Sequence, residues 1–323
     1  MNVTILTPIH NDERTLPRAL AAIAALDWDG RREHLLIDDG STDDSPRLAQ
    51  EFAARQPGAR YLRKPAGGEA SALNLGLQEA TGDWIAILEA DVEPAADWLR
   101  IAAAELADPR VIAVGGYLET PPDDPWVARL AGYEAEIRQP ATPQDVDHLT
   151  SANVLYRAAA FREAGRFDER LFNSCLDMEF NQRLRARGHR LRYQPAARVR
   201  HHFKPSLWGF LSRNYAYGRY RPLLPRQIGQ PGDLAITLQL ALSLLLAGSL
   251  LLACRLPGAP PLLAAIFIGL QIPGMLRLHR HVADPVLWLL PLLTFLRNLA
   301  GLAGLAVGWL EKILRPQPDR ENR

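Results

Sequence analysis

The first 110 residues alternate short apolar runs of strand type with helical patterns, and this alternation constrains the fold more than any other feature. The predicted strands are 3–6, 34–37, 60–62 and 84–88, and the predicted helices between them are 16–26, 45–55 and 70–80. Strands that alternate with helices form βαβ units and a parallel sheet. We therefore expect an α/β fold with a mostly parallel sheet.

Acidic residues follow two of these strands. Asp38-Asp39 ends the second strand, and Glu89 and Asp91 follow the strand 84–88. Ligands of open α/β sheets bind at the carboxyl ends of the strands. Glu89 and Asp91 have strand spacing, so they project to one side, and paired carboxylates suit Mg²⁺ or Mn²⁺. Acidic residues are also common after strands without any ligand, and Asp38 to Ser41 could simply form an Asx turn that precedes a helix.

The charge balance excludes one class of partner. The 323 residues include 37 Lys and Arg against 36 Asp and Glu, for a net charge of +1. This balance offers no electrostatic argument for nucleic acid, and we expect no such partner. Cys175 and Cys254 fall in segments of different character, so we expect no disulfide between them, as suits a reducing compartment. Residues 1–8 lack the basic and long apolar regions of a signal peptide.

The last ninety residues contain three apolar runs. Segment 234–254 has no ionised side chain and is long enough to cross a bilayer of roughly 30 Å. Segment 261–275 is shorter and contains Pro273 and Gly274, and segment 287–310 has Arg297 and Asn298 near its middle. A central Arg costs at least about 2.5 kcal/mol, so this third run could span by pairing Arg297 or could lie in the interface. We expect two crossings, with three as the alternative.

The basic residues around these runs indicate an orientation. They are Arg213, Arg219, Arg221, Arg226, Arg277 and Arg280. By the positive-inside rule we expect a multi-pass protein of the inner (cytoplasmic) membrane, with its catalytic part facing the cytoplasm. The expected domains are 1–225, with a nucleotide-binding half 1–110 and an acceptor half 111–225, and a membrane region 226–323. The aromatic and Arg-bearing segment 208–219 is typical of a juxtamembrane interfacial helix.

Five motifs in order resemble one enzyme family. They are Thr-Pro-Ile-His-Asn at 7–11, Asp-Asp-Gly-Ser at 38–41, the glycine-rich segment 67–76, Glu-Ala-Asp at 89–91, and Gly-Arg-Phe-Asp-Glu at 165–169. Together they resemble the family 2 glycosyltransferases, which have the Rossmann-like GT-A fold. The resemblance covers about residues 1 to 220. It implies transfer of a sugar from a nucleotide-diphosphate sugar, with a divalent metal, Mg²⁺ or Mn²⁺, on the donor diphosphate.

The resemblance also implies site residues. Pro8, Ile9, Glu13 and Asp39 would line the nucleotide pocket, and Asp91 would be the main metal ligand. Glu89 stands where the family has Asp, and its longer side chain could reach a metal-bound water. The full set expected at the donor is Pro8, Ile9, Glu13, Asp39, Lys64, Asn74, Glu89 and Ala90. For Lys64, with Arg63, the alternative is a solvated loop charge.

The catalytic base is expected at Asp177. Segment 175–184 resembles the family's Glu-Asp motif, with Leu176 in place of the usual Glu. Helical geometry agrees, because Asp177 and Glu179 point about 200° apart and cannot serve one site. Glu179 and Arg183 are four residues apart and should form an ion pair. The alternative is that Asp177 only caps its helix, predicted at 177–187.

The segment 198–204 gathers Arg, His and Lys side chains. It could bind the donor pyrophosphate, with His202 as a further metal ligand, or it could be a juxtamembrane patch attracted to anionic lipids. Processive members of the family carry a Gln-X-X-Arg-Trp motif after this point. It is not found in this sequence, which argues for addition of a single sugar.

The expected reaction is inverting transfer to an acceptor at the membrane, either lipid-linked or a cell-envelope glycan. Asp177 would take the proton from the acceptor hydroxyl. Two rivals remain. A sugar nucleotidyltransferase would need a Gly-rich, basic phosphate loop where Pro8-Ile9-His10-Asn11 stands. A non-catalytic membrane scaffold on a decayed transferase fold would explain the departures at Glu89 and Leu176.

Overall fold

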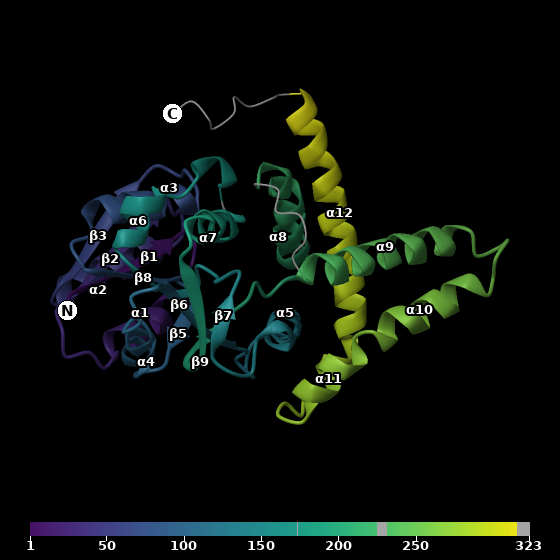
Figure 1. Cartoon of the computed structure of the whole chain (residues 1–323), viewed down its shortest axis with the longest axis horizontal. Helices are drawn as coiled ribbons and strands as arrows, with labels where there is room; N and C mark the ends of the chain where they lie inside the picture. The colour runs from purple at the N-terminus through teal and green to yellow at the C-terminus, as the bar shows by residue number, and fades with distance from the viewer. Residues whose placement is uncertain (173, 225–230, 315–323) are drawn as a thin grey trace. The chain divides into compact units, whose positions relative to one another are not determined.

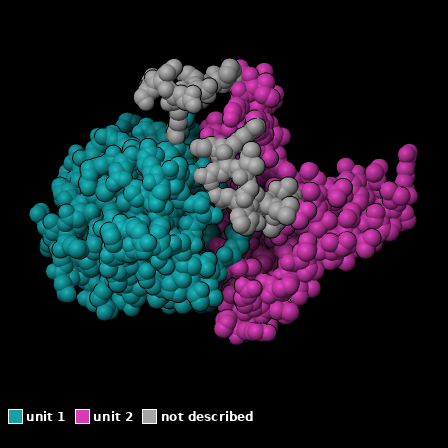
Figure 2. Space-filling view, viewed as in Figure 1, with its two compact units in different colours: residues 1–123, 138–203 teal, residues 124–137, 204–323 magenta. Residues whose placement is uncertain are grey.

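The computed structural model of the chain describes residues 1–172, 174–224 and 231–314, with the side chains of 231–237 outside that description. The chain divides into two compact units, coloured separately in Figure 2. Unit 1 contains residues 1–123 and 138–203, and unit 2 contains residues 124–137 and 204–323. The expected boundary at residue 225 does not coincide with this division, because the chain leaves unit 1 twice.

The first half of unit 1 is a parallel sheet with the strand order β3-β2-β1-β4. Its strands are β1 (Val3–Ile9), β2 (Arg32–Asp39), β3 (Ala59–Lys64) and β4 (Trp84–Leu88). The helices between them are α1 (Leu16–Ala24), α2 (Ser45–Arg55) and α3 (Glu69–Glu79). Every residue of β1 and of β4 is buried, as expected for strands covered on both faces. The α/β prediction is confirmed.

The second half of unit 1 extends the same sheet with mixed directions, in the order β4-β8-β6-β9-β5, and β7 also pairs with β9. These strands are β5 (Val92–Pro94), β6 (Val111–Glu119), β7 (Gln144–Val146), β8 (Asn153–Arg157) and β9 (Arg190–His201). β8 runs antiparallel to β4, and Asn153 pairs with Leu88. The residues just before β8 therefore lie beside those that follow β4. This register brings two distant segments to one edge of the sheet.

Helix α7 (Leu176–Ala186) is held by an aromatic cluster. Phe180 is fully buried, stacks on Phe161 with ring centroids 4.8 Å apart, and also packs against Tyr156 and Phe167. Phe161 belongs to α6 (Ala159–Ala164), and the 3-10 turn Glu169–Leu171 follows. Helix α4 (Trp98–Glu105) covers another part of the sheet through Trp98 and Leu99. The packing of Phe180 fixes the first turn of α7.

Unit 2 is helical among the residues described. Its helices are α5 (Trp126–Arg138), α8 (Leu207–Tyr220), α9 (Pro231–Leu251), α10 (Ala259–Gly269), α11 (Ile272–His279) and α12 (Leu290–Leu314), with 3-10 turns at Arg221–Leu223 and Pro285–Leu289. α8 and α12 lie side by side (Figure 1). A Cβ on Gly304 or Gly308 would overlap the backbone of Tyr215 or Arg219, so glycine allows this close approach.

Among the described residues of unit 2, one helix is long and apolar enough to cross a membrane. It runs over 285–314, with a mean hydropathy of 1.6, and it includes the third predicted run. The pair α10 and α11 passes the same criteria together but is bent by 44°, so it counts as a second crossing only if the break is part of one span. The described part of the first predicted run, Leu238–Leu251, is shorter than a span, and side chains 234–237 lie outside the described residues.

Arg297, in the middle of α12, is paired. Its guanidinium forms an ion pair with the buried Glu134 on α5 and also contacts Asn298 Oδ1. Asn298 in turn donates from Nδ2 to Ser243 Oγ on α9, at 2.9 Å. A spanning helix with a central Arg needs such a partner. Helix α5, which lies between β6 and β7 in the sequence, thus packs with the apolar helices of unit 2.

Candidate active site

Three side chains at the edge of the sheet could hold a metal ion. Glu89 follows β4, Asp91 precedes β5, and His201 ends β9, and their ligand atoms lie within 4.8 Å of one another. The register explains the meeting, because His201 pairs with Val92, the residue after Asp91. His201 Nε2 lies 3.4 Å from Asp91 Oδ1. Carboxylate oxygens are the ligands that Mg²⁺ and Mn²⁺ prefer, and imidazole is a common additional ligand.

The environment of His201 fits a metal ligand. Its side chain is 5% exposed, and among the residues described neither of its ring nitrogens makes a hydrogen bond. A buried imidazole without hydrogen bonds is unfavourable unless another group satisfies it. A cation held by Glu89 and Asp91 would accept one nitrogen lone pair. The donor set therefore fits a divalent metal.

The histidine in this cluster is His201, whereas the sequence indicated His202. Nε2 of His202 lies 2.7 Å from Glu93 Oε1, so this ring is already engaged with a different carboxylate. Strand alternation in β9 gives the reason. Val199 and His201 are buried, while Arg198 and Arg200, which alternate with them, are exposed. That alternation was present in the sequence and is the signal that would have selected His201.

Ser151 links Asp177 to the cluster of Glu89, Asp91 and His201. Ser151 Oγ donates to Glu89 Oε1 at 2.7 Å, and Ser151 N donates to Asp177 Oδ2 at 3.4 Å. Asp177 Oδ1 accepts from the backbone N of Met178 at 2.8 Å. The structure thus brings Glu89, Asp91 and Asp177 to one edge of the sheet. Ser151 was not identified from the sequence, since no local pattern marks it.

The predicted ion pair between Glu179 and Arg183 is confirmed. Both guanidinium contacts, from Nε and from Nη2, are 2.8 Å long. Glu179 is 1% exposed, so the pair is buried in the protein and is not a surface contact. Arg183 also donates to the backbone carbonyls of Ala164 and Arg166. Glu179 therefore holds the Arg183 guanidinium, which connects α7 to the end of α6 and to the loop that follows it.

Asp39 and Lys64 meet at the carboxyl ends of β2 and β3. Lys64 Nζ lies 2.6 Å from Asp39 Oδ1, which also accepts from Gly67 N, and Gly68 N donates to Asp39 Oδ2 at 2.7 Å. Gly68 has a φ of 88°, a conformation that favours glycine. The carboxylate therefore shapes the glycine-rich loop before α3. The neighbouring Asp38 accepts from Ser41 N, three residues on, at 2.8 Å, so its carboxylate shapes the turn that precedes α2.

The remaining expected donor residues have mixed surroundings. Pro8 and Ile9 are buried at the end of β1, and Ala90 packs in the same core cluster as Ile9. Glu13 Oε2 accepts from Asp44 N at the start of α2, at 3.0 Å. Asn74 is buried, donates to Phe167 O and Glu169 Oε1, and accepts from Phe167 N. These bonds occupy the Asn74 amide, and we propose a structural role for it in place of donor contact.

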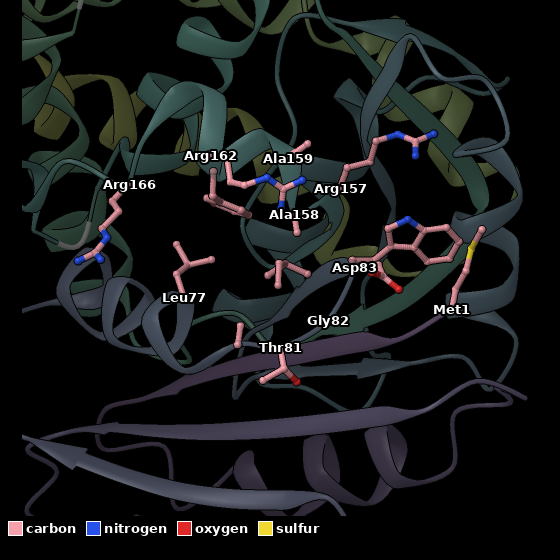
Figure 3. Close-up of a pocket in the computed structure, with 14 residues that line it drawn as sticks. Met1, Leu77, Thr81, Gly82, Asp83, Arg157, Ala158, Ala159, Arg162 and Arg166 are labelled. Atoms are coloured by element: carbon pink, nitrogen blue, oxygen red, sulfur yellow. The ribbon is translucent and has the colours of Figure 1, made fainter.

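A cavity of about 720 Å³ lies elsewhere in unit 1 (Figure 3). It is lined by Asp83 and Trp84 at the start of β4, Arg157 at the end of β8, and Arg162 on α6. Because Glu89 follows the other end of β4, the strand separates the cavity from the acidic cluster by about 17 Å. Ligands of such sheets bind at the carboxyl ends, so we assign the site to the cluster and not to this cavity.

Comparison with known proteins decides the family. The sequence profile described as Glycosyl transferase family 2 matches residues 4–165, which is half of the chain. This chain belongs to glycosyl transferase family 2. The match covers β1 to α6, and therefore includes Glu89, Asp91 and Ser151 but neither Asp177 nor His201. The family and the enzyme class predicted from the motifs are confirmed.

Curated relatives match this family 2 protein over part of their length. It is 29% identical over 246 residues to the pre-mycofactocin glycosyltransferase of Mycobacterium tuberculosis, which covers 73% of this chain and 50% of the relative. It is 22% identical to glycosyltransferase AglE of Haloferax volcanii, over 59% of this chain and 64% of that one. The chain thus spans about half to two thirds of the length of these relatives.

Two solved structures share the fold. The mannosyltransferase PcManGT of Pyrobaculum calidifontis, in complex with GDP-Man and Mn²⁺, superposes with a TM-score of 0.60 at 20% identity, covering 98% of this chain and 88% of that one. Residues 1–349 of Staphylococcus aureus TarS, in complex with UDP, give a TM-score of 0.52 at 18% identity, with 99% and 93% covered. These likenesses confirm the GT-A fold of the family 2 chain.

Proposed function

We propose that this protein transfers a sugar, with inversion and with a divalent metal, from a nucleotide-diphosphate sugar to an acceptor at a membrane. The observation that carries the proposal is the arrangement of Glu89, Asp91 and His201 beside Asp177, with Ser151 in contact with both sides. Metal ligands and a carboxylate base at one sheet edge are what such a transfer requires. Relatives with bound nucleotide sugar and Mn²⁺ support the same reading.

The donor would be held at the ends of the first three strands. The nucleotide pocket would be lined by Pro8, Ile9, Glu13 and Asp39, and Lys64 beside Asp39 would lie near the diphosphate. When bound, Mg²⁺ or Mn²⁺ would offset the charge that develops on the departing nucleoside diphosphate. Glu89, Asp91 and His201 would hold it, with Asp91 as the main ligand. Ala90 would contribute backbone and packing between the two carboxylates.

Asp177 would act as the general base. It takes the proton of the acceptor hydroxyl while the hydroxyl oxygen attacks the anomeric carbon, and the bond to the diphosphate breaks on the opposite face. One displacement inverts the configuration and needs no covalent enzyme intermediate. Glu179 cannot replace Asp177, since Arg183 already engages both of its oxygens.

The apolar surface of unit 2 supports the proposal that the acceptor lies at a membrane. Large apolar side chains are exposed on its helices, among them Leu245, Leu262, Leu292 and Trp208. Exposed apolar area of this extent indicates a lipid bilayer as partner. We propose an inner-membrane location with the catalytic unit in the cytoplasm and with one crossing by α12, and a further one if α10 and α11 act as a broken span. The acceptor would be lipid-linked or a cell-envelope glycan.

A ligand screen on the full chain in detergent tests the proposal. Nucleoside diphosphates, including UDP and GDP, are added with and without Mn²⁺, and the melting temperature is recorded. We expect one of them to stabilise the protein only with Mn²⁺, by about 2.7 kcal/mol at a hundredfold excess over Kd. Stabilisation by none would contradict the donor proposal. Binding without turnover of the matching sugar nucleotide would favour the scaffold alternative.

A further inference from the structure

His148 faces the proposed base from the loop before β8. Its Nε2 lies 3.6 Å from Asp177 Oδ2, and the His148 side chain is 44% exposed against 16% for Asp177. The contact is slightly longer than a hydrogen bond, and catalytic contacts of this kind often tighten when substrate binds. The motifs discussed above do not include His148. Its role depends on which ring nitrogen carries the proton.

Asn181 fixes that proton. The Asn181 side chain is fully buried, and its Nδ2 lies 2.6 Å from the carbonyl oxygen of Leu149, which can only accept. The amide orientation is therefore set, and Oδ1 accepts from the hydroxyl of Tyr156 at 3.3 Å. The second Nδ2 hydrogen points to His148 Nδ1 at 3.2 Å. Nδ1 is thus an acceptor, so a neutral His148 carries its hydrogen on Nε2, the atom that faces Asp177.

We propose that His148 is a positioning residue for the base, and that its Nε2–H holds the Asp177 carboxylate in its orientation. Both Ser151 N and His148 Nε2 approach Oδ2. Oδ1 accepts from Met178 N, and it is the oxygen left to receive the proton of the acceptor hydroxyl. This inference rests on the proposed role of Asp177.

The surrounding charges explain why the base would need such support. The Glu89 carboxylate reaches the same place through Ser151, and its like charge repels the Asp177 carboxylate. Tyr156 on β8 also interacts with this carboxylate, and burial raises the pKa of Tyr156 far above its usual value, so the phenol stays neutral. Behind His148, Asp147 and Arg185 neutralise each other in an ion pair. The Nε2–H dipole therefore adds to the backbone N–H groups of Ser151 and Met178 in holding the Asp177 carboxylate near Glu89.

Two variants separate this role from packing. In His148→Gln the amide can still donate to Asp177, while His148→Phe keeps a ring but cannot donate. With GDP-mannose and UDP-N-acetylglucosamine as donors, and release of nucleoside diphosphate as readout, we expect kcat to fall about tenfold to a hundredfold in His148→Phe. KM for the donor should stay unchanged. His148→Gln should restore most of kcat.

A spectroscopic measurement does not depend on turnover. In protein with ¹⁵N-labelled histidine rings, the His148 signals, identified by their loss in His148→Phe, should report the Nε2–H tautomer. An Nδ1–H tautomer, or a His148→Phe enzyme with unchanged kcat, would overturn the proposal. If Asp177→Asn is inactive in the same assay, either of these overturning results defeats only the role of His148 and leaves Asp177 as the base. If Asp177→Asn is fully active, the base assignment itself fails.

Discussion

Ser151 Oγ donates a hydrogen bond of 2.7 Å to Oε1 of Glu89. This contact gives a physical reason for Glu at a position where the family has Asp, because the longer side chain can lie near Asp91 and His201 and reach Ser151 as well. Since Ser151 N also approaches Asp177, one residue sets the spacing between the cluster and the base. The departure at Glu89 is thus compatible with an intact site and does not by itself indicate a decayed enzyme.

Asp177→Asn should abolish transfer and leave donor binding intact. Asn has nearly the same shape but cannot take a proton, and loss of a general base costs about 10²- to 10⁴-fold in kcat. Initial rates and Mn²⁺-dependent binding of the nucleoside diphosphate are measured on the same sample. Glu179→Gln is a poor control because Glu179 is buried, so Asp123→Asn, on the surface, serves instead. Full activity in Asp177→Asn would remove the base from the mechanism.

His201→Ala should weaken Mn²⁺ binding more than His202→Gln does. Loss of supporting groups around a metal already costs about 10- to 100-fold in affinity, and loss of a ligand should cost at least as much. Gln at 202 can still bond Glu93, so the fold should be kept. Mn²⁺ electron paramagnetic resonance titrations with the nucleoside diphosphate present give both affinities. A larger loss of Mn²⁺ affinity in His202→Gln than in His201→Ala would indicate that His202 is the metal ligand.

Acid should destabilise unit 1 through His34. Burial lowers the pKa of His34 to about 3, and the nearby Arg32 adds to the effect. Above its ordinary pKa near 6.5 the ring is neutral in both states, and below it only the unfolded chain gains a proton. Stability should therefore fall as pH falls from about 6.5 toward 3, by about 2 kcal/mol between pH 7 and pH 5.

Native-state hydrogen exchange of the β1 and β2 amides measures this change on the full chain. In His34→Gln the amide can still bond Thr7 Oγ1, which lies 2.9 Å from His34 Nε2, while no group titrates there. The variant should lose about 2 kcal/mol less than the wild type over the same interval. An equal loss in both proteins would show that other groups cause the acid sensitivity.

The ion pair between Arg297 and Glu134 should be essential for unit 2. Arg297→Met removes the guanidinium that faces a buried carboxylate, and such a change costs about 3–5 kcal/mol. The double variant Glu134→Leu with Arg297→Met should recover much of the loss, because apolar side chains can fill the same space. Thermal unfolding in detergent provides the comparison, with the exposed Arg277→Met as control. A single variant as stable as this control would contradict the pairing.

The parts of the fold that local periodicity determines were predictable. Helix 45–55 and strand 84–88 have the predicted bounds, because apolar spacing and a continuous apolar run are strong signals. The short strands after residue 90 were not identified, since β5 and β7 are three residues long and exist only through pairing with β9. Their register also brings His201 beside Asp91, and that contact decides which histidine belongs to the cluster.

Site residues that belong to a sequence motif could be predicted, whereas those that tertiary packing brings to the site could not. Glu89, Asp91 and Asp177 follow from strand ends and helix geometry. Ser151 and His148 are placed by the antiparallel return of β8 along β4, which no local pattern encodes. Asn74 belongs to a recognisable segment, yet its amide is used to hold Phe167. Likewise α5 has no apolar run of its own that would assign it to the apolar helices of unit 2.

The central claim is that Glu89, Asp91 and His201 hold one metal ion on a diphosphate next to Asp177. The most direct test is an anomalous difference map, recorded at the manganese absorption edge, of crystals of the full chain with Mn²⁺ and the nucleoside diphosphate that the screen selects. We predict one peak at bonding distance from Asp91 and His201, in contact with diphosphate oxygens. A peak at another site, or an ordered diphosphate far from these residues, would contradict the account.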